Sequence, residues 1–240
     1  MKFFKRLLLF LTIIILILFL YKKDYLINKL EDVLISFSVY TENTLKEVYI
    51  TGRINESKIN ILDAINVTLG DPLLNINLEN IRENLNKLSW VKDSSIYLLS
   101  FGQLEIEIYE YIPFGKYTDI NNTTFLINKS GIKFKEININ EFGDLFTLYG
   151  KDALLKVKEL PLIINTLKYF NFNVLKIERI DSRRWNIYLK KGFLIKLPNI
   201  DAINSLDALN KLDNHIDYNN LTFIDLRIKD RISLKYKQVD

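Results

Sequence analysis

The motifs that usually carry nucleophilic or metal chemistry are absent from this chain of 240 residues, although its 29 acidic residues leave chance carboxylate pairs open. The sequence has no cysteine, one histidine (His215), no G-x-S-x-G elbow, no G-x-x-x-x-G-K-[ST] phosphate loop and no H-E-x-x-H metal pair. His215 ends a helical stripe beside Leu212, which favours a capping or surface role over that of a general base. Glu105 and Glu107 share a strand face, but this spacing is typical of a solvated strand. No catalytic residue, metal site or cofactor is therefore expected, and an anchored exported hydrolase is kept only as an alternative.

Recognition of another polypeptide is the chemistry that the C-terminal region suggests. Residues 228–237 alternate between apolar and mostly basic side chains, a pattern typical of a strand with two unlike faces. One face is predicted to hold Ile228, Ile232, Leu234 and Tyr236, and the other Lys229, Arg231, Ser233, Lys235 and Lys237. Few residues follow to cover this strand, and an uncovered edge offers unpaired N–H and C=O groups to a partner. The alternative is that the basic side chains only protect an ordinary edge from aggregation.

Two arginine-containing motifs could bind an acidic partner segment. Arg183 and Arg184 precede Trp185, and Arg227 follows Asp225 by two residues. A guanidinium binds a carboxylate through two parallel hydrogen bonds, so either motif could receive a partner carboxylate. The alternatives are solvated arginines beside a core tryptophan, and a structural ion pair of Arg227 with Asp225 or a neighbour.

An almost entirely apolar run, Leu7 to Tyr21, lies between Lys5-Arg6 and Lys22-Lys23. A helix of this run rises about 22 Å, and flanking aromatic and lysine side chains extend it toward the approximately 30 Å of a bilayer core. The alternative, a cleaved signal peptide, lacks a small-x-small cleavage site. The basic residues before the span predict a cytoplasmic N-terminus and an exported body.

The net charge of +4 comes from this N-terminal segment. Five of the 33 basic residues and one of the 29 acidic residues lie at positions 1–24, so the rest of the chain is electrically balanced. A nucleic-acid-binding body carries a basic excess of its own. Nucleic acid is therefore not expected as a partner.

Periodicity predicts two modules in the exported body. The first has a strand at 45–51, helices at 57–65 (stripe Ile59, Leu62, Ile65) and 77–88, and a hairpin of strands 95–99 and 104–111. The second is mostly strand, with helices near 152–170, where Pro161 breaks or restarts the helix, and 201–215. The expected strands of the second module lie near 123–127, 132–135, 174–180, 184–189, 193–197, 221–228 and 231–237.

These elements and six short motifs resemble the bacterial cell-division family FtsQ/DivIB. The motifs are Val48-Tyr-Ile-Thr-Gly52, Leu88-Ser-Trp-Val-Lys92, Glu110-Tyr-Ile-Pro-Phe-Gly-Lys-Tyr117, Leu126-Ile-Asn-Lys-Ser-Gly131, Arg184-Trp185 with Gly192, and Ile224-Asp-Leu-Arg227. Ser89, Gly115, Tyr117 and Asn128 depart from the family pattern, and these departures blur the turn between the modules without changing the architecture.

The resemblance implies an α+β fold with a single N-terminal transmembrane helix, a POTRA-type β-α-α-β-β domain and a β-rich mixed-sheet domain. The expected divisions are a cytoplasmic tail (1–6), the transmembrane helix (7–23), a stem (24–44), the POTRA domain (45–114), the β domain (115–237) and a tail (238–240). It further implies a non-enzymatic divisome scaffold of the inner membrane, mostly periplasmic and enriched at the septum. The expected partners are the coiled-coil proteins FtsB and FtsL and the septal peptidoglycan synthase complex.

By the same resemblance, FtsB is held by strand addition at residues 228–236, with Arg227, Arg231 and Arg184 in support. Another alternative is a POTRA-bearing assembly or transport component outside cell division.

Overall fold

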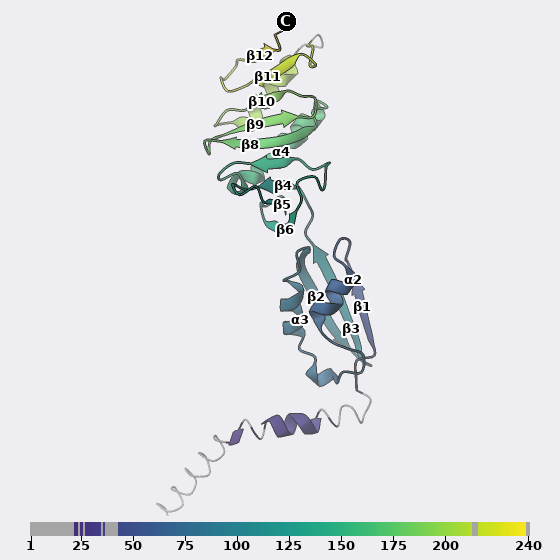
Figure 1. Cartoon of the computed structure of the whole chain (residues 1–240). Coiled ribbons are helices and arrows are strands. Elements are labelled where there is room, and N and C mark those ends of the chain that lie inside the picture. Colours follow the sequence, from purple (N-terminus) through teal and green to yellow (C-terminus); the bar gives the residue numbers. More distant parts are fainter. Residues whose placement is uncertain are drawn as a thin grey trace, which may run out of the picture. The chain divides into compact units, whose positions relative to one another are not determined.

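The computed structural model describes residues 22–23, 25, 27–34, 36, 43–212 and 216–238. The chain divides into two compact units, one ending at Glu110 and one beginning at Tyr111 (Figure 1). The predicted span at 7–23 lies outside the described residues except for Lys22 and Lys23. The described residues between 22 and 36 are helical, and among all described residues no helix has both the length and the apolar character needed to cross a bilayer.

The first unit has the predicted β-α-α-β-β order. Its elements are β1 (Glu47–Thr51), α2 (Lys58–Ile65), the short 3-10 helix η1 (Leu73–Asn75), α3 (Leu78–Leu85), β2 (Val91–Leu99) and β3 (Gln103–Glu110). The sheet order is β1-β3-β2, with β1 parallel and β2 antiparallel to β3. Leu104, Ile106 and Ile108 of β3 are buried together with Ile61 of α2 and Leu85 of α3. The two helices therefore cover one face of this sheet.

Side-chain caps fix the starts of both helices. The Ser57 hydroxyl accepts a hydrogen bond from the Asn60 N–H, and the Asn77 side chain accepts one from the Asn80 N–H, each 3.0 Å long. The predicted apolar stripe of α2 is wrong in part. Ile61 and Ile65 are buried, whereas Ile59 is 70% exposed, because this two-turn helix contacts the sheet through positions i and i+4.

The end of β3 is tied to the loop before α2 by Glu110. Its carboxylate accepts hydrogen bonds from the backbone N–H groups of Ile54 (2.7 Å), Asn55 (2.9 Å) and Glu56 (2.8 Å), and from the Asn55 amide (2.9 Å). Burial alone would raise the pKa of Glu110, but the hydrogen bonds stabilise the carboxylate and bring the net pKa below its ordinary value. The loop is thus held in place by an ionised side chain.

The second unit contains a nine-stranded mixed sheet. Its strands are β4 (Gly115–Thr118), β5 (Thr124–Ile127), β6 (Lys133–Ile137), β7 (Thr147–Tyr149), β8 (Val174–Ile180), β9 (Arg184–Leu189), β10 (Leu194–Lys196), β11 (Leu221–Asp225) and β12 (Ser233–Tyr236). The strand order is β12-β11-β10-β9-β8-β7-β4-β5-β6. The β4/β7, β7/β8 and β10/β11 pairs are parallel and the others are antiparallel.

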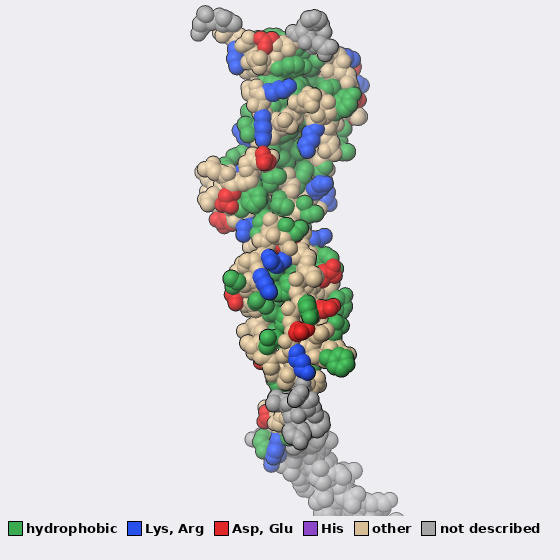
Figure 2. All heavy atoms as spheres, turned by 90° about the vertical axis from the view of Figure 1, so that its right-hand side faces the viewer, with side chains coloured by type: hydrophobic (Ala, Val, Ile, Leu, Met, Phe, Trp, Pro, Cys, Tyr) green, Lys and Arg blue, Asp and Glu red, His purple; other side chains and the backbone are tan. Residues whose placement is uncertain are grey.

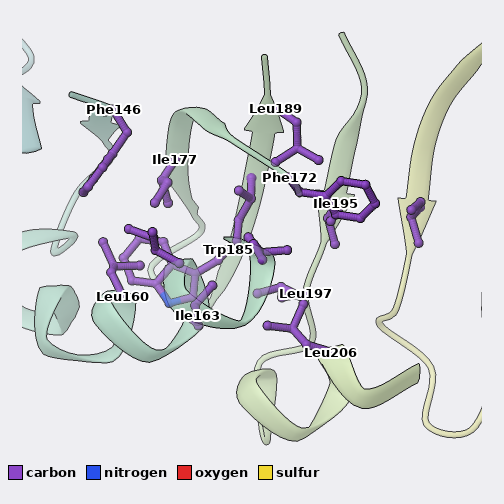
Figure 3. Packing of buried hydrophobic residues seen from close by; sticks show 14 of the residues in the cluster. Phe146, Leu160, Ile163, Phe172, Ile177, Trp185, Leu189, Ile195, Leu197 and Leu206 are labelled. Carbon is purple, nitrogen blue, oxygen red and sulfur yellow. The ribbon is translucent and has the colours of Figure 1, made fainter. Parts of the chain in front are cut away.

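Two helical crossovers build the core of this unit. The 3-10 helix η2 (Leu154–Glu159) and α4 (Leu160–Tyr169) connect β7 to β8, and α5 (Ala202–Ser205) and η3 (Leu206–Lys211) connect β10 to β11. Leu160 and Ile163 of α4 and Leu206 of η3 are fully buried in one cluster with Trp185 of β9. Figure 3 shows these side chains converging between the strands and the helices. Both crossovers therefore pack on the same face of the sheet.

Two details of the second unit differ from the sequence expectation. The strands expected at 221–228 and 231–237 are shorter, because residues 226–232 form a connecting loop with a turn in which the Arg231 N–H donates to the Ile228 carbonyl (3.2 Å). The short strands β4 and β7 were not predicted, since four and three residues carry too little periodicity. Pro161 lies in the first turn of α4, as the restart of the helix required.

Candidate functional site

The terminal strand β12 forms one edge of the nine-stranded sheet. It pairs antiparallel with β11, with Leu234 opposite Ile224, and no strand in the described part of the chain pairs with its other side. Just past β12, the Lys237 N–H donates to the Asn220 carbonyl (2.8 Å). Because N–H groups alternate in direction along a strand, those of Leu234 and Tyr236 point away from β11. Strand β12 therefore presents a short open edge with two outward-pointing N–H donors.

The side chains of this edge lie partly as predicted. Ile232 and Leu234 pack against the core cluster, and Tyr236 is 43% exposed. Ile228 does not share their strand face, because it belongs to the turn before β12 and is 59% exposed. Lys235 and Lys237 are exposed, and Lys237 also donates through Nζ to the Asn219 carbonyl (3.0 Å). The edge therefore combines a core-facing apolar side with lysines facing solvent.

The sheet topology brings the three predicted arginines to one end of the sheet. Arg184 is the first residue of β9, Arg227 follows the end of β11, and Arg231 precedes the start of β12. Strand β9 is antiparallel to β10, β10 is parallel to β11, and β12 is antiparallel to β11. The start of β9, the end of β11 and the start of β12 thus lie at the same end. We call this the arginine end of the sheet.

Arg227 uses its guanidinium within the chain. Its Nε donates to Asp225 Oδ1 (2.8 Å) and its Nη2 to Asp225 Oδ2 (2.6 Å), while its own backbone N–H also reaches Oδ1 (3.1 Å). Burial would raise the pKa of Asp225, but the hydrogen bonds and charge of Arg227 outweigh it and lower that pKa. The hydrogen bond to Asp225 in turn raises the pKa of Arg227. The structural ion pair considered from the sequence is therefore present.

Arg184 and Arg231 are less fully engaged. Arg184 lies 3.7 Å from an Asp181 oxygen, which also lies 3.6 Å from the 65%-exposed side chain of Arg183. Arg231 is exposed and has no ion pair among the described residues. Neither Arg183 nor Arg184 is the arginine that stacks on Trp185.

The arginine that stacks on Trp185 is Arg179, which the sequence reasoning missed. Its guanidinium carbon lies 4.5 Å from the indole centroid, and its side chain is only 7% exposed. A signal was available: Arg179 follows the buried Ile177 by two residues, so strand alternation places it on the core face.

A groove of about 720 Å³ opens beside the arginine end. It lies between residues 198–211 and the loop 226–231. Its lining comprises Pro198, Asn199, Ile200, Asp201, Asn204, Ser205, Asp207, Ala208, Lys211, Leu226, Arg227, Ile228, Lys229, Asp230 and Arg231. Ile200 is 81% exposed there, so apolar surface faces the groove beside the charges. The sequence did not indicate this groove, because two segments distant in the chain form it.

The described part of the chain contains no candidate metal-binding site. No group of three or more His, Asp or Glu side chains is arranged there to hold a metal ion. His215 lies outside the described residues. Glu105 and Glu107 lie on the exposed face of β3, in the first unit.

Comparison with known proteins finds cell-division proteins. Residues 43–111 match the family described as POTRA domain, FtsQ-type, and residues 117–227 match Cell division protein FtsQ/DivIB, C-terminal. The chain is 30% identical over 190 residues to Cell division protein FtsQ of Rickettsia prowazekii, covering 78% of this chain and 70% of that protein. It is 24% identical over 193 residues to the protein of the same name from Rhizobium meliloti, covering 80% and 62%. The second match ends at Arg227, so β12 lies beyond it.

Proposed function

Because the chain belongs to the FtsQ/DivIB family of cell-division proteins, we propose that it is a non-enzymatic scaffold of the divisome that holds FtsB and FtsL on its second unit. The scaffold brings early division proteins to the septal peptidoglycan synthase complex. The protein is anchored in the inner membrane through residues 7–23, with its N-terminus in the cytoplasm. Both units then lie in the periplasm, and the protein concentrates at the division septum.

The observation that carries the docking proposal is the open side of β12. A partner strand that pairs there gains backbone hydrogen bonds to Leu234 and Tyr236, the residues whose N–H groups point away from β11. The core-facing packing of Ile232 and Leu234 holds β12 in register for the incoming strand. The strand edge therefore offers a template for pairing, and its position is fixed by the packing of Ile232 and Leu234 against the core.

The arginine end supplies the electrostatic part of the contact. Arg231 has no ion pair among the described residues and stands at the start of β12, so it is best placed to receive a partner carboxylate. Arg184 shares Asp181 with Arg183 and contributes less. Arg227 fixes the loop through Asp225 rather than reaching outward. Apolar side chains of the partner can pack against the exposed Ile200 and Ile228 in the adjacent groove.

A proline at position 236 tests the strand-addition mode directly. Tyr236→Pro removes an outward-pointing N–H without removing a donor to β11, whereas Tyr236→Thr loses the same ring and keeps the N–H. We expect the proline variant of the full chain, purified in detergent, to bind the FtsB–FtsL pair at least tenfold more weakly than the threonine variant. Equal thermal unfolding of the two variants serves as the fold control. Equal affinities would exclude docking at this edge.

A fluorescent fusion of the wild-type protein tests the divisome role separately from the docking mode. The fusion is expected at midcell rings in dividing cells. A uniform envelope signal would contradict a role at the septum, even if binding in vitro were intact.

A further inference from the structure

We propose that the uncovered face of the β1-β3-β2 sheet in the first unit is a docking site for a basic peptide segment with arginine or lysine at alternate positions. We call it the tyrosine–glutamate face. It lies in the other unit from β12 and does not depend on the docking proposed there. The occupant is identified by charge and by aromatic chemistry.

Strand alternation and register define the residues of this face. Leu104, Ile106 and Ile108 of β3 are buried under the helices, so Gln103, Glu105, Glu107 and Tyr109 point to the opposite side. Glu105 pairs with Tyr49 on β1 and with Tyr97 on β2. The carboxylate of Glu105 is therefore flanked by two tyrosines, which are 47% and 55% exposed.

In the part of this face that surrounds Glu105, the charge has one sign. Among the residues of strand segments 47–51, 95–99 and 103–109 that point to it, three are glutamates (Glu47, Glu105 and Glu107) and none is lysine or arginine. Figure 2, which views the molecule from the side of β1, shows acidic, basic and hydrophobic side chains on this unit. A second copy of the same face or an anionic lipid surface would be repelled by it.

Two of the carboxylates already influence their tyrosine neighbours. The Tyr49 hydroxyl donates to Glu47 Oε2 (2.5 Å), and this hydrogen bond raises the pKa of Tyr49. A hydrogen bond to Glu107 likewise raises the pKa of Tyr109. The carboxylate of Glu105, in contrast, has no hydrogen bond or ion pair among the described residues and acts on Tyr49 only through its charge, although it sits at the centre of the face.

A basic side chain complements each of these features. A guanidinium between Tyr49 and Tyr97 would pair with the Glu105 carboxylate and contact the two ring faces, combining an ion pair with cation–π attraction. Glu105 and Glu107 are two residues apart on one strand, a spacing of about 7 Å, and alternate side chains of an extended peptide have the same spacing. The fit is therefore to an extended segment whose basic residues alternate.

Binding of two synthetic peptides to the full-length protein tests this proposal. One peptide alternates arginine and serine, and the other has the same composition with the arginines contiguous. We expect the alternating peptide to bind more tightly, and Glu105→Gln to weaken its binding roughly fivefold to tenfold and Tyr97→Ala roughly threefold. Glu83→Gln, the same charge change at an exposed site on α3, should alter binding by less than about twofold.

Three results would overturn the inference. They are no measurable binding of the alternating peptide at low salt, equal affinity for both peptides, and an equal loss in the Glu83→Gln and Glu105→Gln variants. The Tyr236→Pro variant should bind the peptide as the wild type does, which separates this face from the FtsB–FtsL edge.

Discussion

Arg179 and Trp185 lie directly opposite one another on β8 and β9, and the guanidinium carbon of Arg179 is 4.5 Å from the centroid of the indole ring. The indole Nε1 donates to Glu159 Oε2 (3.1 Å), and Arg179 Nη1 lies 4.0 Å from the same oxygen. A strand pair and the end of η2 are thereby joined through one carboxylate. The cluster anchors the crossover that leads into α4.

Removing the Arg179 side chain should destabilise the second unit by about 2 kcal/mol, because a buried cation–π contact and the packing of the aliphatic stem are lost together. Arg183→Ala, at a 65%-exposed side chain, is the matched control and should change stability by less than about 0.5 kcal/mol. Urea unfolding followed by Trp185 fluorescence in a Trp90→Phe background measures the difference. Equal midpoints for the two variants would contradict a structural role of the stack.

Gly52→Ala should destabilise the first unit by about 3 kcal/mol. Gly52 has φ of +77°, and a Cβ there would lie 2.2 Å from the Ile108 carbonyl oxygen. Gly70→Ala is the control, because Gly70 also has positive φ (+97°) but open space, so only about 1 kcal/mol is expected. Hydrogen exchange of the β3 amides measures the stability of the two variants, and Gly52→Ala should show the lower protection. Similar protection in both variants would show that crowding at Ile108 is unimportant.

Glu110→Gln should cost the first unit about 2 kcal/mol at neutral pH, because charge-assisted hydrogen bonds to the 54–56 loop are lost. The folded protein lowers the pKa of Glu110 from its ordinary 4.5, so this stabilisation is present above that pH and is lost as the pH falls through the folded-state pKa. Thermal unfolding between pH 7 and pH 3 should therefore show the gap between wild type and variant closing on the acid side. A constant gap would mean that the carboxylate charge plays no part.

Asp225→Asn should loosen the loop 226–232 by releasing the guanidinium of Arg227, at a cost of about 1 kcal/mol. Asp230→Asn, in the same loop, has no ion pair among the described residues and is expected to be neutral. Limited proteolysis of the full chain should cleave only the first variant faster near residues 226–232. Equal cleavage rates would argue that the pair does not hold the loop.

The sequence predicted local elements better than it predicted their partners in space. Helical caps such as Asn77 and the 95–111 hairpin depend on neighbouring residues, so their signals lie within a few positions of one another. The stripe of α2 failed because a two-turn helix offers more than one apolar face, and only packing chose Ile61 over Ile59. The parallel pairing of β10 with β11 joins segments about 30 residues apart and leaves no local pattern.

The candidate edge was located correctly at the end of the sheet, but its details depended on tertiary structure. Alternation indicated Ile232, Leu234 and Tyr236. Asp230 breaks the apolar alternation between Ile228 and Ile232, and this signal of the turn was overlooked. The bidentate pairing of Arg227 with Asp225 was one of two open readings, and only the backbone conformation after β11 decides it. Whether these residues bind a partner stays a prediction.

The β11–β12 hairpin is joined to the rest of the sheet by a ladder of only three residues on each side, Leu194 to Lys196 against Phe223 to Asp225. A seam this short lowers the free-energy cost of opening the hairpin, compared with strands joined by longer ladders such as β8 and β9. A ligand that binds only the closed form shifts that equilibrium by mass action. A partner bound to β12 is consequently expected to slow the opening of the ladder at β10, two strands away from the binding site.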